Sequence, residues 1–188
     1  MSTFSAARYW EDRYRKGGIS GAGSRGDEAA WKVAQIQHVI TTYRVRSLLD
    51  LGCGDGVVVA GLRVPTYVGY DVAPTAVAAC KALMPYHQFT TELPPESVTF
   101  DMTMSVDVLF HLVDPEDFRA HLGALFSRSH RLVLIYATDH DQRGAPHVLH
   151  RAWTRSWSPP EGWTLLWSEE VPADRRKRIG LFERSESR

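Results

Sequence analysis

Three acidic residues surround a glycine-rich run, and this combination could bind a ligand that carries positive charge. The run Gly52-Cys53-Gly54-Asp55-Gly56 follows the apolar stretch Leu48–Leu51, which includes Asp50. Further along, Asp71 ends a second apolar stretch. Glycines at alternate positions let a backbone approach a ligand closely, because no side chain intervenes. A glycine turn after one strand and a carboxylate after the next are typical of a nucleoside site, where the acid accepts hydrogen bonds from ribose hydroxyls.

The charges around the glycine run indicate the kind of nucleoside. No Lys or Arg lies between Asp50 and Gly61, so a pyrophosphate would meet carboxylates with no nearby cation to offset them. The third glycine of a dinucleotide fingerprint would fall at Val57, and the chain has it one residue earlier, at Gly56. These residues disfavour a nicotinamide-dependent oxidoreductase. They favour S-adenosylmethionine, which carries a sulfonium, an ammonium and a ribose but no phosphate.

Three motifs follow one another along the chain: Leu49–Gly56, Val68–Asp71 and Phe100–Leu112. In this order they resemble the motifs of the class I S-adenosylmethionine-dependent methyltransferases, in particular the small stand-alone bacterial ones. The resemblance extends from Arg46 to Thr138. It implies an enzyme that uses S-adenosylmethionine as its cofactor.

The resemblance also implies a role for particular residues. The backbone of the glycine run would contact the methionine part, Asp71 the ribose, and Val72 and Thr90 the adenine, while Ser105 and Val106 would lie beside the sulfonium. The residues that it assigns to the cofactor are Asp50, Gly52, Cys53, Gly54, Asp71, Val72, Thr90, Ser105 and Val106.

Histidines follow the fourth and fifth expected strands, on the side where an acceptor would lie. An amine or hydroxyl acceptor must lose a proton, and histidine is the commonest base near neutral pH. We therefore predict a base among His111, His147 and His150, and acceptor contacts from Tyr14, His140 and Trp153. The alternatives are a His111 that only packs, a solvated loop around the other histidines, and a Trp153 that packs on the sheet. We predict no metal, because the histidines lack ligand spacing and have few carboxylates nearby.

The elements that must position these residues alternate between strands and helices, which predicts a parallel doubly wound sheet. We expect a seven-stranded, mostly parallel sheet with an antiparallel C-terminal strand, helices on both faces and an N-terminal helical cap. Trp163 and Trp167 should share one face of their strand. The expected strands are 47–51, 66–70, 87–90, 102–105, 131–136, 163–169 and 177–182. The expected helices are 2–15, 28–43 with Asp27 as its cap, 56–62, 74–83 and 115–126, with a turn or two over 151–157.

Length and composition predict one methyltransferase domain, with residues 1–45 as cap helices and a glycine-rich loop and 46–188 as a Rossmann-like core. Lys and Arg number 22 and so do Asp and Glu, so no overall positive charge attracts nucleic acid. The basic run Arg175–Arg178 is interpreted as a solvated turn or edge strand rather than a phosphate site. Two cysteines and the absence of a signal-like or membrane-spanning stretch favour a cytoplasmic protein, monomeric or homodimeric.

We therefore expect a methyltransferase that acts on an oxygen or nitrogen of a small molecule, in natural-product or saccharide biosynthesis. The alternatives are a family member that binds the cofactor without turnover, and a methyltransferase that acts on protein or nucleic acid.

Overall fold

The computed structural model describes residues 4–185, and they form two compact units, one of residues 5–94 and one that begins at Pro95. The expected first helix begins at Ser2, so its first two residues lie outside the described part. Among the described residues, no helix is long and apolar enough to cross a membrane.

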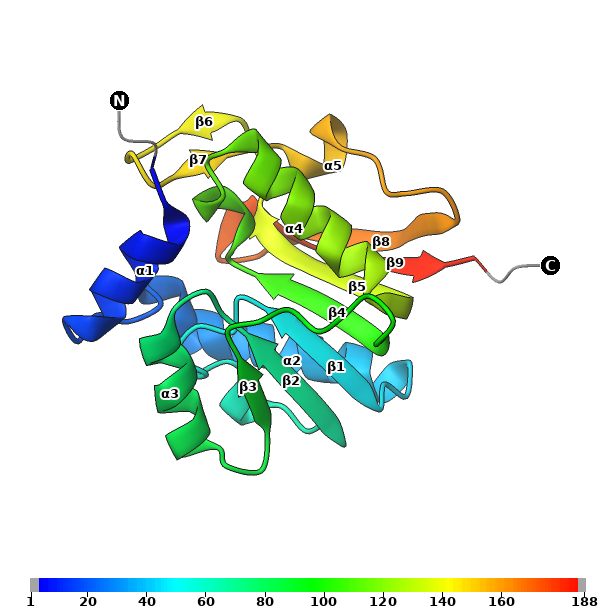
Figure 1. The fold of residues 1–188 in the computed structure, drawn as a ribbon. Helices are drawn as coiled ribbons and strands as arrows, with labels where there is room; N and C mark the ends of the chain where they lie inside the picture. Colours follow the sequence, from blue (N-terminus) through cyan, green and yellow to red (C-terminus); the bar gives the residue numbers. More distant parts are fainter. Residues whose placement is uncertain (1–3, 186–188) are drawn as a thin grey trace. The chain divides into compact units, whose positions relative to one another are not determined.

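The first unit holds three parallel strands in the order β3-β2-β1 (Figure 1). Helix α1 packs on α3, and α3 packs on β3. The helices and turns of this unit are α1 (Ala6–Arg15), η1 (Ala22–Ser24), α2 (Gly26–Thr42), η2 (Val59–Gly61) and α3 (Pro74–Leu83). Its strands are β1 (Ser47–Leu51), β2 (Thr66–Tyr70) and β3 (Gln88–Thr90).

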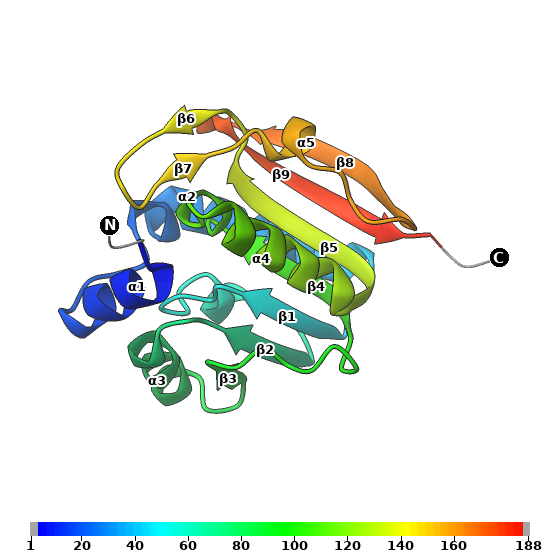
Figure 2. The ribbon, with the colours of Figure 1, turned by 45° about the horizontal axis from the view of Figure 1, so that its top comes forward.

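The second unit holds four strands of the large sheet, in the order β4-β5-β9-β8, and a separate antiparallel pair, β6 and β7. β4 and β5 are parallel, whereas β9 is antiparallel to both β5 and β8. Helix α4 lies along β4 and β5 (Figures 1 and 2). The strands are β4 (Phe100–Val106), β5 (Ser129–Thr138), β6 (Gln142–Arg143), β7 (Leu149–His150), β8 (Trp163–Val171) and β9 (Asp174–Arg184). The helices and turns are η3 (Leu109–His111), α4 (Pro115–Ser127) and α5 (Trp153–Ser156).

The expected fold class is confirmed: the large sheet has seven strands, mostly parallel, with an antiparallel strand at the C-terminal end. Buried apolar strands explain this arrangement, since Leu48, Leu49 and Leu51 of β1 and residues 132–137 of β5 are almost wholly inaccessible to solvent. Strands buried on both faces read as continuous apolar runs, as these do.

Helix α1 ends in a turn that directs the chain back toward the sheet. Gly17 adopts φ +78°, and the amides of Gly17 and Gly18 donate to the carbonyls of Tyr14 and Arg13. This is the glycine C-cap in which a left-handed residue closes the helix end. A Cβ on Gly18 would lie 2.7 Å from the Arg13 carbonyl oxygen, so the turn depends on glycine at this position.

Three expectations about local structure are wrong. The helix expected at 56–62 is only the short η2 turn, preceded by irregular turns. Helix α2 begins at Gly26 with Arg25 as its N-cap, so Asp27 lies in the first turn, where a carboxylate favours the helix dipole, and is not the cap. The register of β8 shifts between Leu165 and Trp167, which places Trp163 and Trp167 on opposite faces.

Candidate active site

The glycine run forms a turn in which every backbone amide already has a partner. Gly52, Gly54 and Gly56 all have left-handed φ values, of 95°, 57° and 77°. The amides of Gly52 and Cys53 donate to the Tyr70 carbonyl, that of Gly54 to Asp71 Oδ2, that of Asp55 to Ser20 Oγ, and that of Gly56 to the Cys53 carbonyl. A phosphate-binding loop would keep such amides for its anion. In this turn all five amides are already bonded, so none is left to bind an anion.

Asp71 directly follows β2 and is buried against the turn. Its Oδ2 accepts from the Gly54 amide at 2.9 Å, and its Oδ1 accepts from the Ala73 amide at 2.9 Å. Burial raises the pKa of Asp71, and these two hydrogen bonds oppose the rise. Each carboxylate oxygen keeps a further lone pair, so Asp71 can still accept from a diol.

Asp50 lies under the turn with one oxygen unsatisfied. Its Oδ2 accepts a hydrogen bond of 2.9 Å from the Tyr67 hydroxyl, whereas its buried Oδ1 has no hydrogen-bond partner among the described residues. Burial raises the pKa of Asp50 to about 7; the Tyr67 hydrogen bond opposes this rise, and the charge of Asp71 adds to it. A buried orphan acceptor beside a turn without spare amides fits the positively charged S-adenosylmethionine better than a phosphate ester.

The remaining expected cofactor residues of this unit are Cys53, Val72 and Thr90. Cys53 hydrogen-bonds with Cys80, whose thiol donates to the Gly54 carbonyl at 3.3 Å. Val72 follows Asp71 with 37% of its surface exposed, which leaves it accessible to a flat ring. The hydroxyl of Thr90 is bonded to both backbone groups of Glu92.

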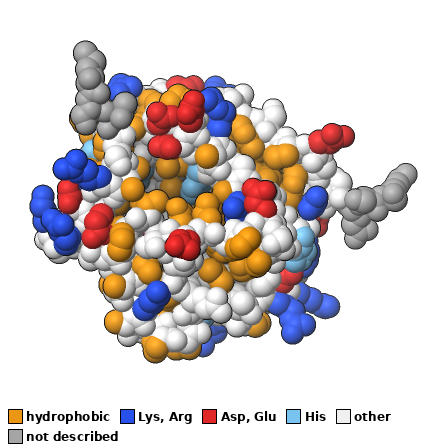
Figure 3. Space-filling view, viewed as in Figure 1, with side chains coloured by type: hydrophobic (Ala, Val, Ile, Leu, Met, Phe, Trp, Pro, Cys, Tyr) orange, Lys and Arg blue, Asp and Glu red, His pale blue; other side chains and the backbone are white. Residues whose placement is uncertain are grey.

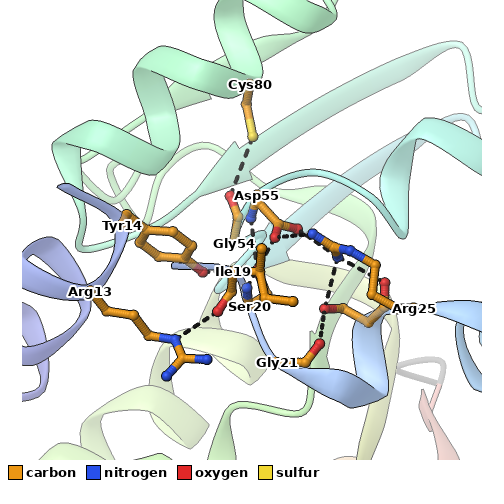
Figure 4. A network of polar contacts seen from close by, with 10 residues as sticks. Arg13, Tyr14, Ile19, Ser20, Gly21, Arg25, Gly54, Asp55 and Cys80 are labelled. Carbon is orange, nitrogen blue, oxygen red and sulfur yellow. Dashed lines mark hydrogen bonds and ion pairs between the residues drawn. The ribbon is translucent and has the colours of Figure 1, made fainter. Parts of the chain in front are cut away.

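The segment between α1 and α2 is fastened onto the glycine turn (Figure 4). The Ser20 amide donates to Asp55 Oδ2 at 3.0 Å, and the Asp55 amide donates to Ser20 Oγ at 2.9 Å. Tyr14 Oη lies 2.8 Å from Ser20 Oγ, and Arg25 pairs with Asp55 at 2.7 Å. The sequence predicted acceptor contacts for Tyr14, but the structure places its hydroxyl against the cofactor turn.

Sequence reasoning missed Ser20 and Arg25. Its one available signal was the density of glycines between Gly17 and Gly26, which allows that segment to fold close over another element. Nothing in the spacing identifies Asp55, 35 residues from Ser20, as the partner.

In the second unit, four histidines gather near the carboxyl ends of β4 and β5. The rings of His111 and His147 stack at 5.9 Å, and those of His140 and His150 stack at 4.7 Å. Phe110 lies between the two pairs, 4.4 Å from His111 and 5.6 Å from His150. All three expected bases and the expected contact residue His140 thus come together. No group of three His, Cys, Asp or Glu side chains in residues 4–185 is placed to hold a metal ion.

The hydrogen bond of His111 fixes which ring nitrogen carries the proton. His111 Nδ1 lies 3.2 Å from the carbonyl oxygen of His147. A carbonyl oxygen can only accept, so Nδ1 carries the hydrogen and the lone pair of the neutral ring lies on Nε2. This is the tautomer of a histidine held in position to accept a proton.

His150 and His140 differ in their hydrogen bonding. His150 Nδ1 lies 2.8 Å from Thr138 Oγ1, and burial, together with His140 and Arg176, lowers the pKa of His150. The two ring nitrogens of His140 are buried without a hydrogen-bond partner in the described part of the chain.

Two expected site residues turn away from this region. Ser105 is wholly buried, and its hydroxyl lies 2.8 Å from Nε2 of His121 on α4, so only its backbone could face a ligand; Val106, next in the strand, is partly exposed. Trp153 is 1% exposed and packs on Phe182 and on the backbone at Gly180, which leaves no surface for an acceptor.

Asp107, within the third motif, has a backbone conformation that the sequence does not reveal. It follows β4 with φ +59°, and its amide donates to the Tyr136 carbonyl at 2.8 Å. Lys177 of β9 lies 4.0 Å from its carboxylate. Left-handed non-glycine residues persist where the surroundings hold them, and they gather at functional sites.

The basic run at the start of β9 is matched by acids. Arg176 pairs with Asp174, Lys177 with Asp107, and Arg178 with both Asp139 and Glu170. On the face drawn in Figure 3, acidic and basic side chains are interspersed. The expectation of a turn or edge strand at Arg175–Arg178 is wrong, because these residues belong to β9, which lies between β5 and β8 in the sheet.

Comparisons with known proteins identify the family. A family model described as a methyltransferase domain matches residues 25–178. A tRNA U34 carboxymethyltransferase from Pseudoalteromonas translucida is 27% identical in an alignment of 176 residues that covers 84% of this chain and 55% of that protein. The chain therefore spans about half the length of this curated relative.

Solved structures agree in fold. The N-methyltransferase NodS from Bradyrhizobium japonicum, in complex with S-adenosyl-L-homocysteine, matches with a TM-score of 0.73 and 16% identity over 97% of this chain and 100% of its own. The small RNA methyltransferase HEN1 matches with a TM-score of 0.68 and 15% identity over 85% of this chain and 25% of its own.

Proposed function

Because the chain belongs to the class I S-adenosylmethionine-dependent methyltransferases, we propose that it methylates an oxygen or nitrogen of a small molecule. The observation that carries this proposal is the group of histidines in the second unit, and above all the fixed tautomer of His111. When bound, S-adenosylmethionine supplies a methyl group on a positively charged sulphur, ready for in-line displacement.

The first unit would bind this cofactor. Asp71 would accept from the ribose hydroxyls, and the backbone of Gly52 and Gly54 would lie along the methionine part. Asp50, with its unsatisfied oxygen, would face the positive charge. The unsatisfied Asp50 oxygen and the spare lone pairs of Asp71 support this assignment, because an ammonium and a ribose diol need hydrogen-bond acceptors. Val72, Thr90, Ser105 and Val106 keep the roles that the resemblance gives them, Ser105 through its backbone alone.

The histidine group would remove the acceptor's proton. His111 would accept it on Nε2, while the His147 carbonyl holds Nδ1–H and so sets the direction of the ring. His150, whose pKa is lowered by burial, is neutral at pH 7 and is the second candidate base. Positioning of this kind typically contributes a factor of about 10²–10⁴ in rate.

An RNA acceptor is the second candidate function, because the curated relative is named for a tRNA and a structural neighbour for small RNA. The basic run of β9 favours a small molecule over RNA, since Arg176, Lys177 and Arg178 already have carboxylate partners. A family member that only binds the cofactor would lack any need for an oriented imidazole.

The test combines a cofactor titration with an acceptor screen. We expect S-adenosylhomocysteine to bind the wild-type protein in calorimetry at or below about 100 μM. We expect pooled phenols, amines and sugars, incubated with S-adenosylmethionine, to yield a product heavier by one methylene unit in mass spectrometry. His111→Gln should lower the rate of that product's formation by about 10²-fold or more and leave cofactor affinity unchanged.

The matched control is His38→Gln, a substitution of an exposed histidine on α2, which should leave both measurements unchanged. If His111→Gln formed product at the wild-type rate, the base would be His150 or His147 instead of His111. Cofactor binding without product from any acceptor would favour the non-catalytic alternative.

A further inference from the structure

The segment that joins α1 to α2 lies directly on the backbone of the cofactor turn. We call residues 17–25 the strap. A Cβ built on Gly54 would lie 2.4 Å from Ser20 Oγ and 3.1 Å from the Tyr14 hydroxyl. Gly54 is therefore glycine for two reasons: its φ of +57° and the strap that covers it. A strap that lay farther from the turn would leave room for a Cβ at Gly54.

The contacts between strap and turn are reciprocal and specific. Ser20 donates its amide to the Asp55 carboxylate, and Asp55 donates its amide to the Ser20 hydroxyl. The same exchange of two amide donors is what makes a capping box at a helix terminus effective. Arg25 adds a charge-assisted contact to both Asp55 oxygens, at 2.7 and 3.4 Å (Figure 4).

The strap is itself internally braced. Lys32 is 1% exposed, and its ammonium donates to the Gly23 carbonyl at 2.6 Å and pairs with Glu28. Ser24 Oγ donates to the Gly21 carbonyl at 2.7 Å, and Arg13 Nε donates to the Ile19 carbonyl at 2.7 Å. A buried ammonium must keep its hydrogen bonds, so the loop that supplies the carbonyl is held in one conformation. The strap is thus built to present Ser20 at a fixed place.

Helix α1, which leads into the strap, is fixed to the same unit. The Glu11 carboxylate accepts from both the amide and the hydroxyl of Thr75, at 3.0 and 2.7 Å, and so caps the first turn of α3 from outside that helix. Tyr14 packs with Ala73 and Ala76, and the Ala73 amide donates to Asp71. Tyr14 is therefore held by the same segment that helps to hold Asp71.

We infer that Ser20 is a positioning residue for cofactor binding: with Asp55 and Tyr14 it locks the glycine turn in the conformation that receives the amino-acid end of S-adenosylmethionine. The inference rests on the proposed cofactor site. Without the lock, Gly54 and Gly56 are free to leave their left-handed conformations, and part of the binding free energy is spent on ordering the turn.

The test measures the dissociation constant of S-adenosylhomocysteine by calorimetry at 25 °C for folded variants. Ser20→Ala should weaken binding by about tenfold, as expected for the loss of about one net hydrogen bond, and Ser20→Thr, which keeps the hydroxyl, should restore most of it. Tyr14→Phe should weaken binding as well. It should add nothing in the Ser20→Ala background, because both changes act through the Ser20 oxygen.

Ala22→Ser is the matched control, because Ala22 lies in the same strap with an exposed side chain that takes part in none of these hydrogen bonds. It should bind the cofactor product as wild type does. Hydrogen exchange of the cofactor-free protein gives a second readout: the Asp55 amide should exchange faster in Ser20→Ala and at the wild-type rate in Ala22→Ser.

Equal affinities of wild type and Ser20→Ala within twofold would overturn the inference, as would an equal loss in Ala22→Ser. If Ser20→Ala does not fold, Tyr14→Phe decides in the same way. A wild-type protein that fails to bind S-adenosylhomocysteine would instead refute the proposed cofactor site, and the inference with it.

Discussion

Asp50, Asp55 and Asp71 belong to the same turn, yet their surroundings hold them in different states. Burial raises the pKa of Asp50 to about 7. Burial acts on Asp55 too, but hydrogen bonds from Arg25 and Ser20 outweigh it and lower its pKa. Burial raises the pKa of Asp71 as well, against two backbone amides. At neutral pH Asp50 is close to its pKa, so a nearby cation can increase the fraction of it that is ionised.

The pKa of Asp50 predicts a pH-dependent stability. In the unfolded chain this carboxyl ionises near pH 4, and in the folded protein at about 7. Between these values the folded state holds a proton that the unfolded state has released, so the Asp50 contribution to stability falls as pH rises from about 4 to 7. Asp50→Asn removes this loss. The difference in free energy of unfolding between this variant and wild type should therefore grow in favour of the variant from pH 4 to pH 7. Above pH 7 the difference should stay constant.

Urea denaturation at several pH values checks this result. The control is Glu161→Gln, a substitution of an exposed carboxylate in the turn before β8. It should run parallel to wild type at every pH. A lead of Asp50→Asn that is the same at pH 4 as at pH 7 would mean that Asp50 ionises normally in the folded protein.

At the scale of elements, helices and strands with strong local sequence signals could be predicted, and those with weak signals could not. Strands β1 and β2 and helix α3 match their expected bounds, because apolar runs and a proline at the first helical turn define them. The helix expected after the glycine turn fails for a physical reason. Gly56 is left-handed and three valines follow it, a combination with low helix propensity in a segment too short to offset the cost of nucleation.

Elements that depend on contacts with distant parts of the chain leave no pattern in the local sequence. Strands β6 and β7 are two residues each, and no periodicity can show in so short a segment. The bulge in β8 turns Trp167 away from the face of Trp163, and alternation in the sequence cannot reveal an inserted residue. Trp153 has the sequence context of a pocket residue, and only the packing of Phe182 against it shows that it belongs to the core.

Arg151 is predicted to hold the histidine-bearing segment after β5 in place. Its guanidinium donates to the carbonyls of Leu112 and Val113, at 2.7 and 3.0 Å, and lies 4.5 Å from the Phe118 ring centre. Arg151→Met keeps the apolar stem but leaves both carbonyls without this donor. We expect a loss of about 1–3 kcal/mol in the free energy of unfolding.

Chemical denaturation measures this loss. Arg155→Met, on the exposed side of α5, serves as its control and should change stability by less than about 0.5 kcal/mol. Equal stability of the two variants would show that solvent replaces the Arg151 donors without cost, and that the segment is held by its packing alone.

At the scale of the whole molecule, the sequence predicted the family and the cofactor better than the way the site is assembled. Three ordered motifs are local in the chain, so the positions of Asp50 and Asp71 relative to the glycine run follow from the order of the strands. The pairing of Ser20 with Asp55 and the convergence of four histidines are contacts between distant segments. Such contacts depend on the packed fold, which a single sequence does not display.

The distribution of charge over the molecule predicts weak binding to RNA. Equal numbers of acidic and basic residues, and a basic run whose cations are paired with acids, leave little charge to displace counterions from a phosphate backbone. In fluorescence anisotropy with labelled tRNA we expect a dissociation constant weaker than about 100 μM at 50 mM salt, the weak end of non-specific binding. Asp174→Asn, which removes the carboxylate that pairs with Arg176, should strengthen the binding and so show that the assay detects a freed cation. Micromolar affinity of the wild type, falling steeply between 50 and 200 mM salt, would instead identify RNA as the acceptor class, because that slope counts the phosphates that the protein neutralises.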